Sequence, residues 1–386
     1  MTRLRGIAWD HTRGYVPAAA TGQAYHDTHP EIEIEWERRS LWAFGEQALS
    51  DVASRFDLIV IDHPLIGDAV AQQLLVPIDQ FVPEETLDAL RAGSVGRSFE
   101  SYTHDGRQWA LPIDAAAQVS AWRPDLLDRV GGRPPASWDE LLALAAESRR
   151  VAVPLKAIDA LSLFFTLCAQ SGTPPLSGNA AALECATVEE CLQRLEQLAA
   201  VVDHRSLDWN PIDLLRLMSS SDEIIYSPFL FGYSNYSRPG FARHLVTFGP
   251  PPQLVSGVVG GTTLGGTGIA VSRSCDAVEA AVAYASWVAT PECQGTLYLS
   301  SGGQPAQRMV WTDDAANRLC GGFFAATLET LERAYLRPNL PGMPQLQAEA
   351  GDAVYRFLRG EAPLAETATT LCDQATSFYD ELRVSI

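Results

Sequence analysis

The chain has 386 residues, of which 47% are hydrophobic and 9% aromatic, and this length predicts two globular domains of roughly 150 to 200 residues each. Its formal net charge is −19, and Lys156 is its one lysine. Such a surface repels polyanions, so we expect no binding to nucleic acid or to anionic membranes. No apolar run approaches the roughly 18 residues of a membrane helix, which predicts a soluble protein.

The cysteines number seven and have no CxxC spacing, which argues against a zinc site and against a full disulfide framework. Met1 leads directly into a predicted strand, with no leader-like segment. We therefore expect a reducing, cytoplasmic location, or a periplasmic one if a leader is missing from this sequence. The cysteines are Cys168, Cys185, Cys191, Cys275, Cys293, Cys320 and Cys372.

The N-terminal part alternates predicted strands and helices, which is typical of a doubly wound α/β sheet. Two of these strands are followed directly by an Asp-His pair, Asp10-His11 and Asp62-His63. Ligands of such sheets bind at the carboxyl ends of the strands, so we expect both pairs to face one crevice if the strands are neighbours. The predicted strands are 4–9, 31–36 and 57–61, and the predicted helices are 17–28 and 44–56.

Residues 102–127 predict a hairpin followed by a crossover between two domains. Asp105-Gly106 is a strong two-residue turn signal. Pro112 lacks an amide hydrogen, so it marks either an edge strand or the end of a sheet, and we expect the strand 108–113 to run into it and a new strand to cover 118–122. Two sheets that meet at a proline predict an interdomain hinge.

The rest of the chain is mostly helical by its pattern. Ser137 and Glu140 form a capping-box motif at the start of a helix. Residues 227–236 predict an aromatic loop. The six glycines within 257–268 are too many for the interior of a helix or strand, so we expect the backbone there to approach another group closely or to cross between the two domains. Other predicted elements are strands at 151–155, 223–226 and 269–272 and helices at 158–170, 187–202, 210–219, 276–289, 291–299, 312–318, 323–335, 341–358 and 363–382.

Several separated motifs resemble, in the same order, those of ABC-transporter extracellular solute-binding proteins, the family of the maltose- and other sugar-binding proteins. Each motif is weak alone, and their order carries the resemblance, which covers nearly the whole chain. The motifs are Asp57-Leu-Ile-Val-Ile-Asp62, Leu74-Leu-Val-Pro-Ile-Asp79, Ala110-Leu-Pro-Ile113, Ala121-Trp-Arg-Pro-Asp-Leu126, Pro134-Pro-Ala-Ser-Trp-Asp-Glu-Leu141, Gly268-Ile-Ala-Val-Ser272 and Gly302-Gly-Gln-Pro-Ala306.

The resemblance implies a two-lobed α/β periplasmic-binding-protein fold (type II, maltose-binding-protein-like), with the ligand in a cleft between the lobes. It implies a first lobe of residues 1–113 plus 262–318 and a second lobe of 114–261 plus 319–386. The hinges would lie near 112–114, 259–263 and 318–322. Arg13 stands where maltose-binding members have a lysine, which implies a cleft position. Ala116 replaces a sugar-binding acid, so we do not expect maltose itself as the ligand.

Aromatic side chains are candidates for ligand contact because sugars stack their C–H faces on such rings. Packing in the core is the alternative for each of them. The aromatic candidates are Trp9, Trp42, Trp209, Tyr226, Phe229, Phe231 and Tyr233.

The two Asp-His pairs leave three interpretations open. They cap helix starts, or they bind a polar ligand, or they form a catalytic acid–base or metal site with Asp114. Gly261 and Thr262 either present an amide and a hydroxyl to the ligand or simply form a crossover that needs positive φ. No Walker-type nucleotide loop and no GxSxG motif occurs.

We therefore expect a monomeric binding protein that closes two lobes over a small polar organic ligand, a sugar or a hydroxy acid, without cofactor or metal. An ABC permease would be its partner if the protein is exported. The alternative is a cytoplasmic enzyme or sensor on the same fold, with His11, His63, Asp10, Asp62 and Asp114 as its acid–base residues.

Overall fold

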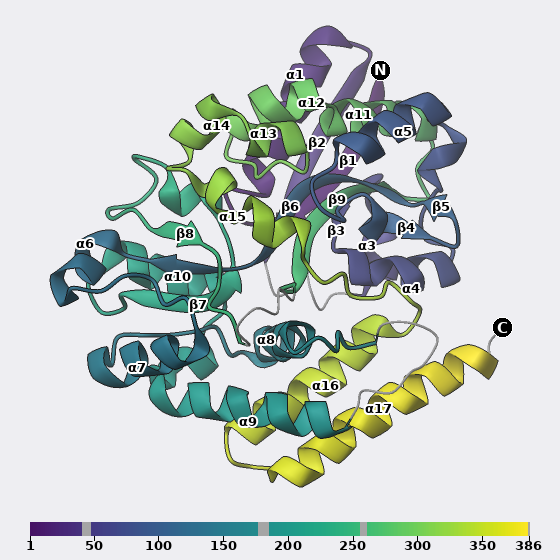
Figure 1. Cartoon of the computed structure of the whole chain (residues 1–386). Helices are drawn as coiled ribbons and strands as arrows, with labels where there is room; N and C mark the ends of the chain where they lie inside the picture. The colour runs from purple at the N-terminus through teal and green to yellow at the C-terminus, as the bar shows by residue number, and fades with distance from the viewer. Residues whose placement is uncertain (41–47, 177–184, 255–260, 385–386) are drawn as a thin grey trace. The chain divides into compact units, whose positions relative to one another are not determined.

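The computed structural model describes residues 1–40, 48–176, 185–254 and 261–384. The chain forms two compact units (Figure 1). Unit 1 contains residues 1–116, 265–318 and 339–343, and unit 2 contains 117–264, 319–338 and 344–386. The segment 339–343, which returns to unit 1 between two stretches of unit 2, was not predicted from the sequence.

Unit 1 is built on a mixed β-sheet. Strand β1 (Thr2–Trp9) pairs in parallel with β2 (Ile32–Arg39) and with β3 (Leu58–Ile61), as the alternating pattern predicted. Strand β3 pairs antiparallel with β9 (Leu264–Val271), and β9 is followed in the sheet order by β6 (Ala110–Trp122). Strands β6 and β9 both continue from one unit into the other.

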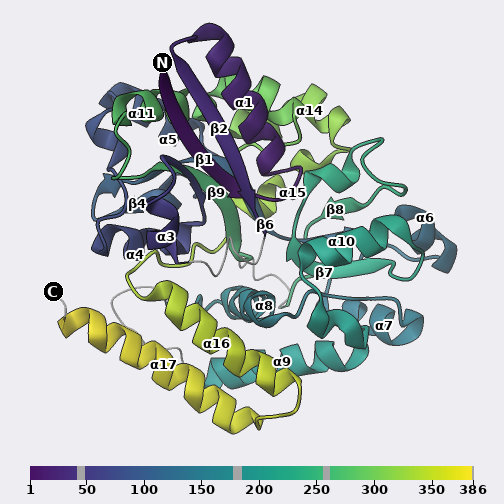
Figure 2. The same cartoon turned by 180° about the vertical axis from the view of Figure 1, so that it is seen from behind.

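Helices cover both faces of the unit 1 sheet because β1 and β3 carry apolar side chains on both sides. One face packs Leu4, Ala8 and Val60 against α1, α5 and α11. The opposite face packs Ile7, Ile59 and Ile61 against α3 and α4. Figure 2 shows α1 beside β1 and β2. The helices of unit 1 are α1 (Tyr15–Thr28), α3 (Leu49–Ala53), α4 (Ile66–Ala71), α5 (Glu84–Gly93), α11 (Val278–Ala289), α12 (Pro291–Cys293), α13 (Arg308–Trp311) and α14 (Asp314–Leu319).

The predicted hairpin is present and the predicted break after it is not. Asp105 and Gly106, with φ of 50° and 71°, form the turn between β4 (Thr103–His104) and β5 (Arg107–Gln108). Of the two alternatives at Pro112, the end of a sheet is wrong, because β6 runs unbroken through the proline to Trp122. Strand β6 is the last strand of the sheet within unit 1, and an edge strand tolerates a residue without an amide hydrogen.

The prediction that glycines exclude a regular element around 265–268 is also wrong, because β9 contains three of them. Gly266 has a φ of +109°, and a Cβ there would lie 2.4 Å from the Asp114 carbonyl oxygen. A Cβ on Gly268 would lie 2.9 Å from the Tyr102 ring. These glycines are therefore explained by close approach of β6 and of an aromatic ring to the strand.

Unit 2 combines the second half of β6 with two antiparallel neighbours, β7 (Tyr226–Phe231) and β8 (Thr247–Gly249). Strand β7 occupies half of the predicted aromatic loop, while residues 151–155 form only a single bridge, Val151 to Tyr226, instead of the predicted strand. The helices of unit 2 are α6 (Pro124–Leu127), α7 (Trp138–Ser148), α8 (Ala157–Gln170), α9 (Cys185–Val201), α10 (Pro211–Ser220), α15 (Phe323–Glu332), α16 (Met343–Leu358) and α17 (Leu364–Val384).

Two helix starts show how local sequence fixes the elements of unit 2. Ser137 accepts the amide hydrogen of Glu140 at 3.3 Å and caps α7, as its motif predicted. Asn210 and Asp213 form a reciprocal capping box at the start of α10, where Pro211 occupies the first helical position.

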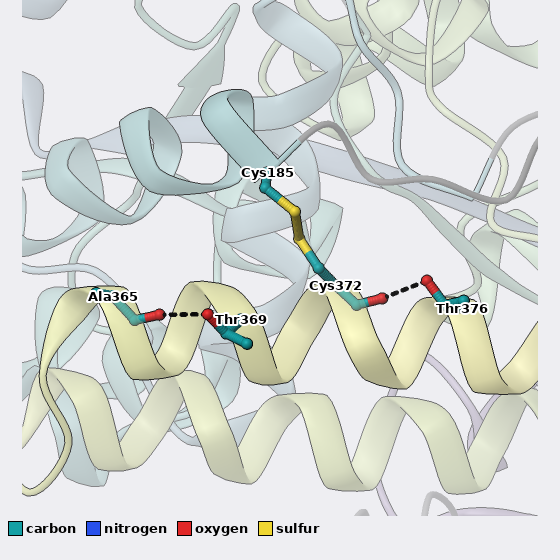
Figure 3. Close-up of a disulfide and its surroundings, with 5 residues drawn as sticks. All are labelled: Cys185, Ala365, Thr369, Cys372 and Thr376. Atoms are coloured by element: carbon teal, nitrogen blue, oxygen red, sulfur yellow. Dashed lines mark hydrogen bonds between the residues drawn. A yellow bond between two sulfur atoms is a disulfide. The ribbon is translucent and has the colours of Figure 1, made fainter.

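One pair of cysteines is bonded, which the expectation of a reducing location did not predict. Cys185, at the start of α9, forms a disulfide with Cys372 of α17 (Figure 3). The two residues are 187 positions apart in the sequence. They meet because α9 and α17 pack side by side, which no spacing of cysteines reveals. The remaining five cysteines are buried thiols.

No helix among the described residues is long and apolar enough to cross a membrane.

Candidate functional site

The carboxyl ends of β1 and β3 are neighbours in unit 1. Gly6 pairs with Leu58 and Ile7 with Ile59, so the same register brings the residues after the two strands to one edge of the sheet. The condition set by the sequence is met, since the two strands that precede Asp10-His11 and Asp62-His63 are adjacent and parallel.

The two aspartates nevertheless make different contacts. Asp10 is exposed, and its carboxylate pairs with Arg38 of β2 at 3.2 Å. Asp62 accepts the amide hydrogen of His63 at 2.8 Å and lies 3.1 Å from its Nδ1. Asp62 thus caps the short 3₁₀ helix His63–Leu65, which is one of the interpretations left open by the sequence.

The two histidines are buried, with 9% of His11 and 1% of His63 exposed. His11 Nδ1 accepts the amide hydrogen of Arg13 at 3.0 Å. That contact assigns the proton of a neutral His11 ring to Nε2. The ring of His63 packs edge-on against Tyr102, with 6.4 Å between the ring centroids.

Arg13 and Asp114 form an ion pair inside unit 1. Arg13 Nε donates to Asp114 Oδ2 at 2.7 Å, its second nitrogen donates to Oδ1, and both side chains are at most 4% exposed. Burial raises the pKa of Asp114, Arg13 opposes that rise, and the carboxylate of Asp62 adds to it. The sequence nominated both residues separately and did not indicate that they bind each other.

Thr267 is a candidate site residue that the sequence did not nominate. Continuing the β3–β9 register by one step from Ile61 and Gly268 places Thr267 opposite Asp62, whose backbone is still extended. Opposed residues of paired strands share a face of the sheet. The hydroxyl of Thr267 is buried and makes no hydrogen bond with the described residues. Only its position beside glycines in the motif GGTG marked it in the sequence.

Three aromatic candidates are buried in the units. Trp9 is 3% exposed, belongs to the unit 1 core and packs against Gly14 so closely that a Cβ there would lie 2.3 Å from the ring. Tyr226 and Phe229 of β7 are 0% and 1% exposed. The burial of these three residues fits core packing, which is the alternative stated for them.

The remaining candidates occupy more varied positions. Trp209 is half-buried and stacks under the guanidinium of Arg205, 4.9 Å from the ring centroid. Trp42 lies outside the described residues. Phe231 ends β7, and Tyr233 is buried just after it.

Gly261 and Thr262 make close contacts within unit 2. A Cβ on Gly261 would lie 1.9 Å from the carbonyl oxygen of Arg333, so this glycine is explained by close backbone approach and not by positive φ. Thr262 is 1% exposed and donates its hydroxyl to the carbonyl of Gln118 at 2.7 Å.

Asp159, in the first turn of α8, is a second residue that the sequence did not nominate. It is 7% exposed and makes no side-chain hydrogen bond with the described part of the chain. Burial raises its pKa to about 7, opposed by Lys156 and reinforced by Asp213. Its signal in the sequence was one acid within an otherwise apolar helix.

Among the described residues, no group of three or more His, Cys, Asp or Glu side chains is arranged to hold a metal ion. The Asp-His pairs therefore gain no support for the metal interpretation.

The family model of bacterial extracellular solute-binding proteins matches residues 20–316, well over half of the chain. The chain belongs to this family. Its members are extracellular binding proteins, which supports the solute-binding interpretation over the enzyme alternative.

A curated relative is a putative binding protein of Brucella abortus (strain 2308), 28% identical over 132 residues. The match covers 32% of this chain and 30% of that protein, so the chain spans less than a third of the relative's length.

Three solved structures share the fold. Maltose-bound MalE3 of T. maritima has a TM-score of 0.84 at 15% identity and covers 98% of this chain and 100% of its own. A ribitol complex from Agrobacterium radiobacter K84 has a TM-score of 0.81 at 18% identity and covers 98% of both chains. A D-mannitol complex from Agrobacterium vitis S4 has a TM-score of 0.80 at 14% identity and covers 99% of both. These likenesses show the two-lobed maltose-binding-protein-like fold.

Proposed function

We propose that this solute-binding protein binds a small polyol or sugar and delivers it to an ABC permease. The observation that carries the proposal is the polar edge of unit 1, where Asp62, His11 and Thr267 follow or flank adjacent strand ends. The bound ligands of the three structural neighbours support the class, since ribitol and D-mannitol are linear polyols and maltose is a disaccharide.

The chemistry of this edge suits hydroxyl groups. A carboxylate accepts hydrogen bonds, a neutral imidazole with its proton on Nε2 donates one, and a threonine hydroxyl does either. A polyol offers several hydroxyls that each donate and accept, so it satisfies all three side chains without carrying a charge. With its net charge of −19, the protein also disfavours anionic ligands such as hydroxy acids over neutral polyols.

Thermal unfolding in the presence of polyols, hexoses and disaccharides tests this function. A ligand that binds only the folded protein raises stability by RT ln(1 + [L]/Kd), about 2.7 kcal/mol at a hundredfold excess over Kd. We expect a polyol to raise the Tm of the wild type and to raise it much less in Asp62→Asn and His11→Ala. His204→Ala is the matched control, because its side chain is 92% exposed on unit 2.

Equal Tm shifts in the wild type and in both site variants would remove this edge of unit 1 from the binding site. A Tm that rises with a hydroxy acid and with no neutral polyol or sugar tested would replace the proposed ligand class. Conversion of the ligand to a product would restore the enzyme alternative.

A further inference from the structure

Tyr102 places its hydroxyl at the end of the contact between β3 and β9. The residue ends the 3₁₀ helix Glu100–Tyr102 of unit 1 and is 2% exposed. Its hydroxyl donates to the carbonyl of Ile61 at 3.3 Å and to the carbonyl of Gly266 at 3.4 Å. A hydroxyl has one hydrogen, so the two carbonyls share it, which fits distances longer than those of an ordinary O–H···O bond.

Each of these two carbonyls directly precedes a residue of the candidate site. Ile61 is the last residue of β3 and precedes Asp62, and Gly266 precedes Thr267 within β9. Among the described residues, the ladder of the two strands ends with the pair Ile61 and Gly268. The phenol of Tyr102 therefore joins the strands beyond their last ladder pair, beside the backbone that carries Asp62 and Thr267.

The ring that carries this hydroxyl is closely packed. A Cβ on Gly268 would lie 2.9 Å from Cζ of Tyr102, the carbon that bears the hydroxyl, so the ring lies directly against the glycine. The ring of His63 packs edge-on against the same ring. The side-chain amide of Asn339 donates to the carbonyls of the residues before and after Tyr102, at 3.0 and 2.9 Å. Both the ring and its backbone are thus fixed within unit 1.

We propose that Tyr102 is a positioning residue for the bound polyol, which sets the separation of the Asp62 carboxylate and the Thr267 hydroxyl. This role rests on the proposed function, because it concerns two side chains that would meet hydroxyls of the ligand. A backbone held at both strand ends keeps the two side chains in place before the ligand arrives. Binding then requires less ordering of the protein, which raises the affinity.

Tyr102→Phe removes the hydroxyl and keeps the ring against Gly268 and His63. Tyr284→Phe is the matched control, because Tyr284 is also a buried tyrosine of unit 1 and is 0% exposed. Its hydroxyl is hydrogen-bonded to that of Thr21 at 2.8 Å, between α11 and α1. Both variants lose one buried hydroxyl, and only the first loses the link between the ends of β3 and β9.

Hydrogen exchange of the ligand-free proteins tests the link itself. We expect the amide hydrogens of residues 60–63 and 265–268 to exchange severalfold faster in Tyr102→Phe than in the wild type, because the strand ends open more readily. In Tyr284→Phe the same amides should exchange at the wild-type rate. Unchanged exchange in Tyr102→Phe overturns the proposal.

Calorimetric titration with ribitol, D-mannitol and maltose, well below the Tm of every variant, tests the effect on binding. We expect Tyr102→Phe to weaken the binding by roughly tenfold and Tyr284→Phe by less than about twofold. In a Thr267→Val background, Tyr102→Phe should weaken the binding much less, because one of the two positioned side chains no longer contacts the ligand. A residue that only stabilises the fold would change the affinity in neither background, since all the proteins are folded during the titration.

Two titration results overturn the proposal. One is equal affinity of Tyr102→Phe and the wild type, even if exchange is faster in the variant. The other is the same loss of affinity with and without Thr267→Val. If none of the three compounds binds the wild type, the proposed function is overturned instead, and the exchange rates still decide whether Tyr102 holds the two strand ends together.

Discussion

Arg13 and Asp114 bind each other through two hydrogen bonds inside unit 1, although 101 residues separate them in the sequence. The arginine comes from the loop before α1 and the aspartate from β6. This pair joins the segment after β1 to the edge strand of the same sheet.

Removing one partner of this pair should destabilise the protein strongly. Arg13→Met leaves the Asp114 carboxylate buried without its counter-ion, and we expect a loss of about 3–5 kcal/mol at pH 7. The loss should shrink as the pH falls, because a buried carboxyl without Arg13 becomes protonated more readily. Urea unfolding at several pH values measures it. The double variant Arg13→Met/Asp114→Leu should recover much of the loss, and a double variant less stable than both single variants would contradict the interpretation.

Thr267→Val should separate stability from binding. The hydroxyl is buried and makes no hydrogen bond with the described residues, so its replacement by a methyl group should raise the unfolding free energy by about 1 kcal/mol. If this hydroxyl contacts the polyol, the same change should weaken binding by roughly tenfold. Urea unfolding and calorimetric titration give the two values. Thr267→Ser is the control that keeps the hydroxyl, and equal affinity of both variants would exclude Thr267 from ligand contact.

Asp159 should make stability depend on pH between about 4 and 7. Its pKa is raised from 3.8 to about 7, so over this range the folded protein binds a proton that the unfolded chain has lost. Stability from this group is therefore greatest at acidic pH and falls as the pH rises, by roughly 1.4 kcal/mol for each unit of pKa shift. Asp159→Asn should be more stable than the wild type at pH 7 and about equal near pH 4. The exposed Asp208→Asn is the control, and parallel pH profiles of the wild type and Asp159→Asn would contradict the prediction.

The disulfide between Cys185 and Cys372 should contribute about 2–5 kcal/mol to the stability of the chain. The variant Cys185→Ser/Cys372→Ser should unfold at a lower urea concentration than the wild type. Dithiothreitol should lower the wild-type midpoint at least to that of the variant, while Cys320→Ser should remain sensitive to the reductant. An unchanged wild-type midpoint in dithiothreitol would show that the bond does not stabilise the fold.

The sequence predicted the elements that depend on local chemistry. The turn at Asp105-Gly106 and the cap at Ser137 follow from backbone conformation and hydrogen bonding within a few residues. The pairing of β1 with β2 also follows, because sequential parallel strands are usually neighbours, whereas the adjacency of β1 and β3 was only a condition in the sequence and the sheet order meets it.

The failures concern contacts between distant segments. Pro112 and Gly266 were expected to interrupt regular strands. Pro112 is tolerated because β6 is the last strand of the sheet within unit 1, and Gly266 is required because the Asp114 carbonyl of β6 approaches it closely. The charge of Arg13 was visible, but its pairing with Asp114 depends on the approach of β6 to the β1 end. The burial that raises the pKa of Asp159 likewise comes from the packing around α8.

The bond between Cys185 and Cys372 closes the chain between them into a covalent ring. That ring contains β7, β9 and α11, and it therefore leaves unit 2 and returns twice, through residues 265–318 and 339–343 of unit 1. A single proteolytic cut within the ring would produce two fragments that remain one molecule on a non-reducing gel. A cut before Cys185 would release a separate N-terminal fragment, so the gel pattern alone would place the cut inside or outside the ring.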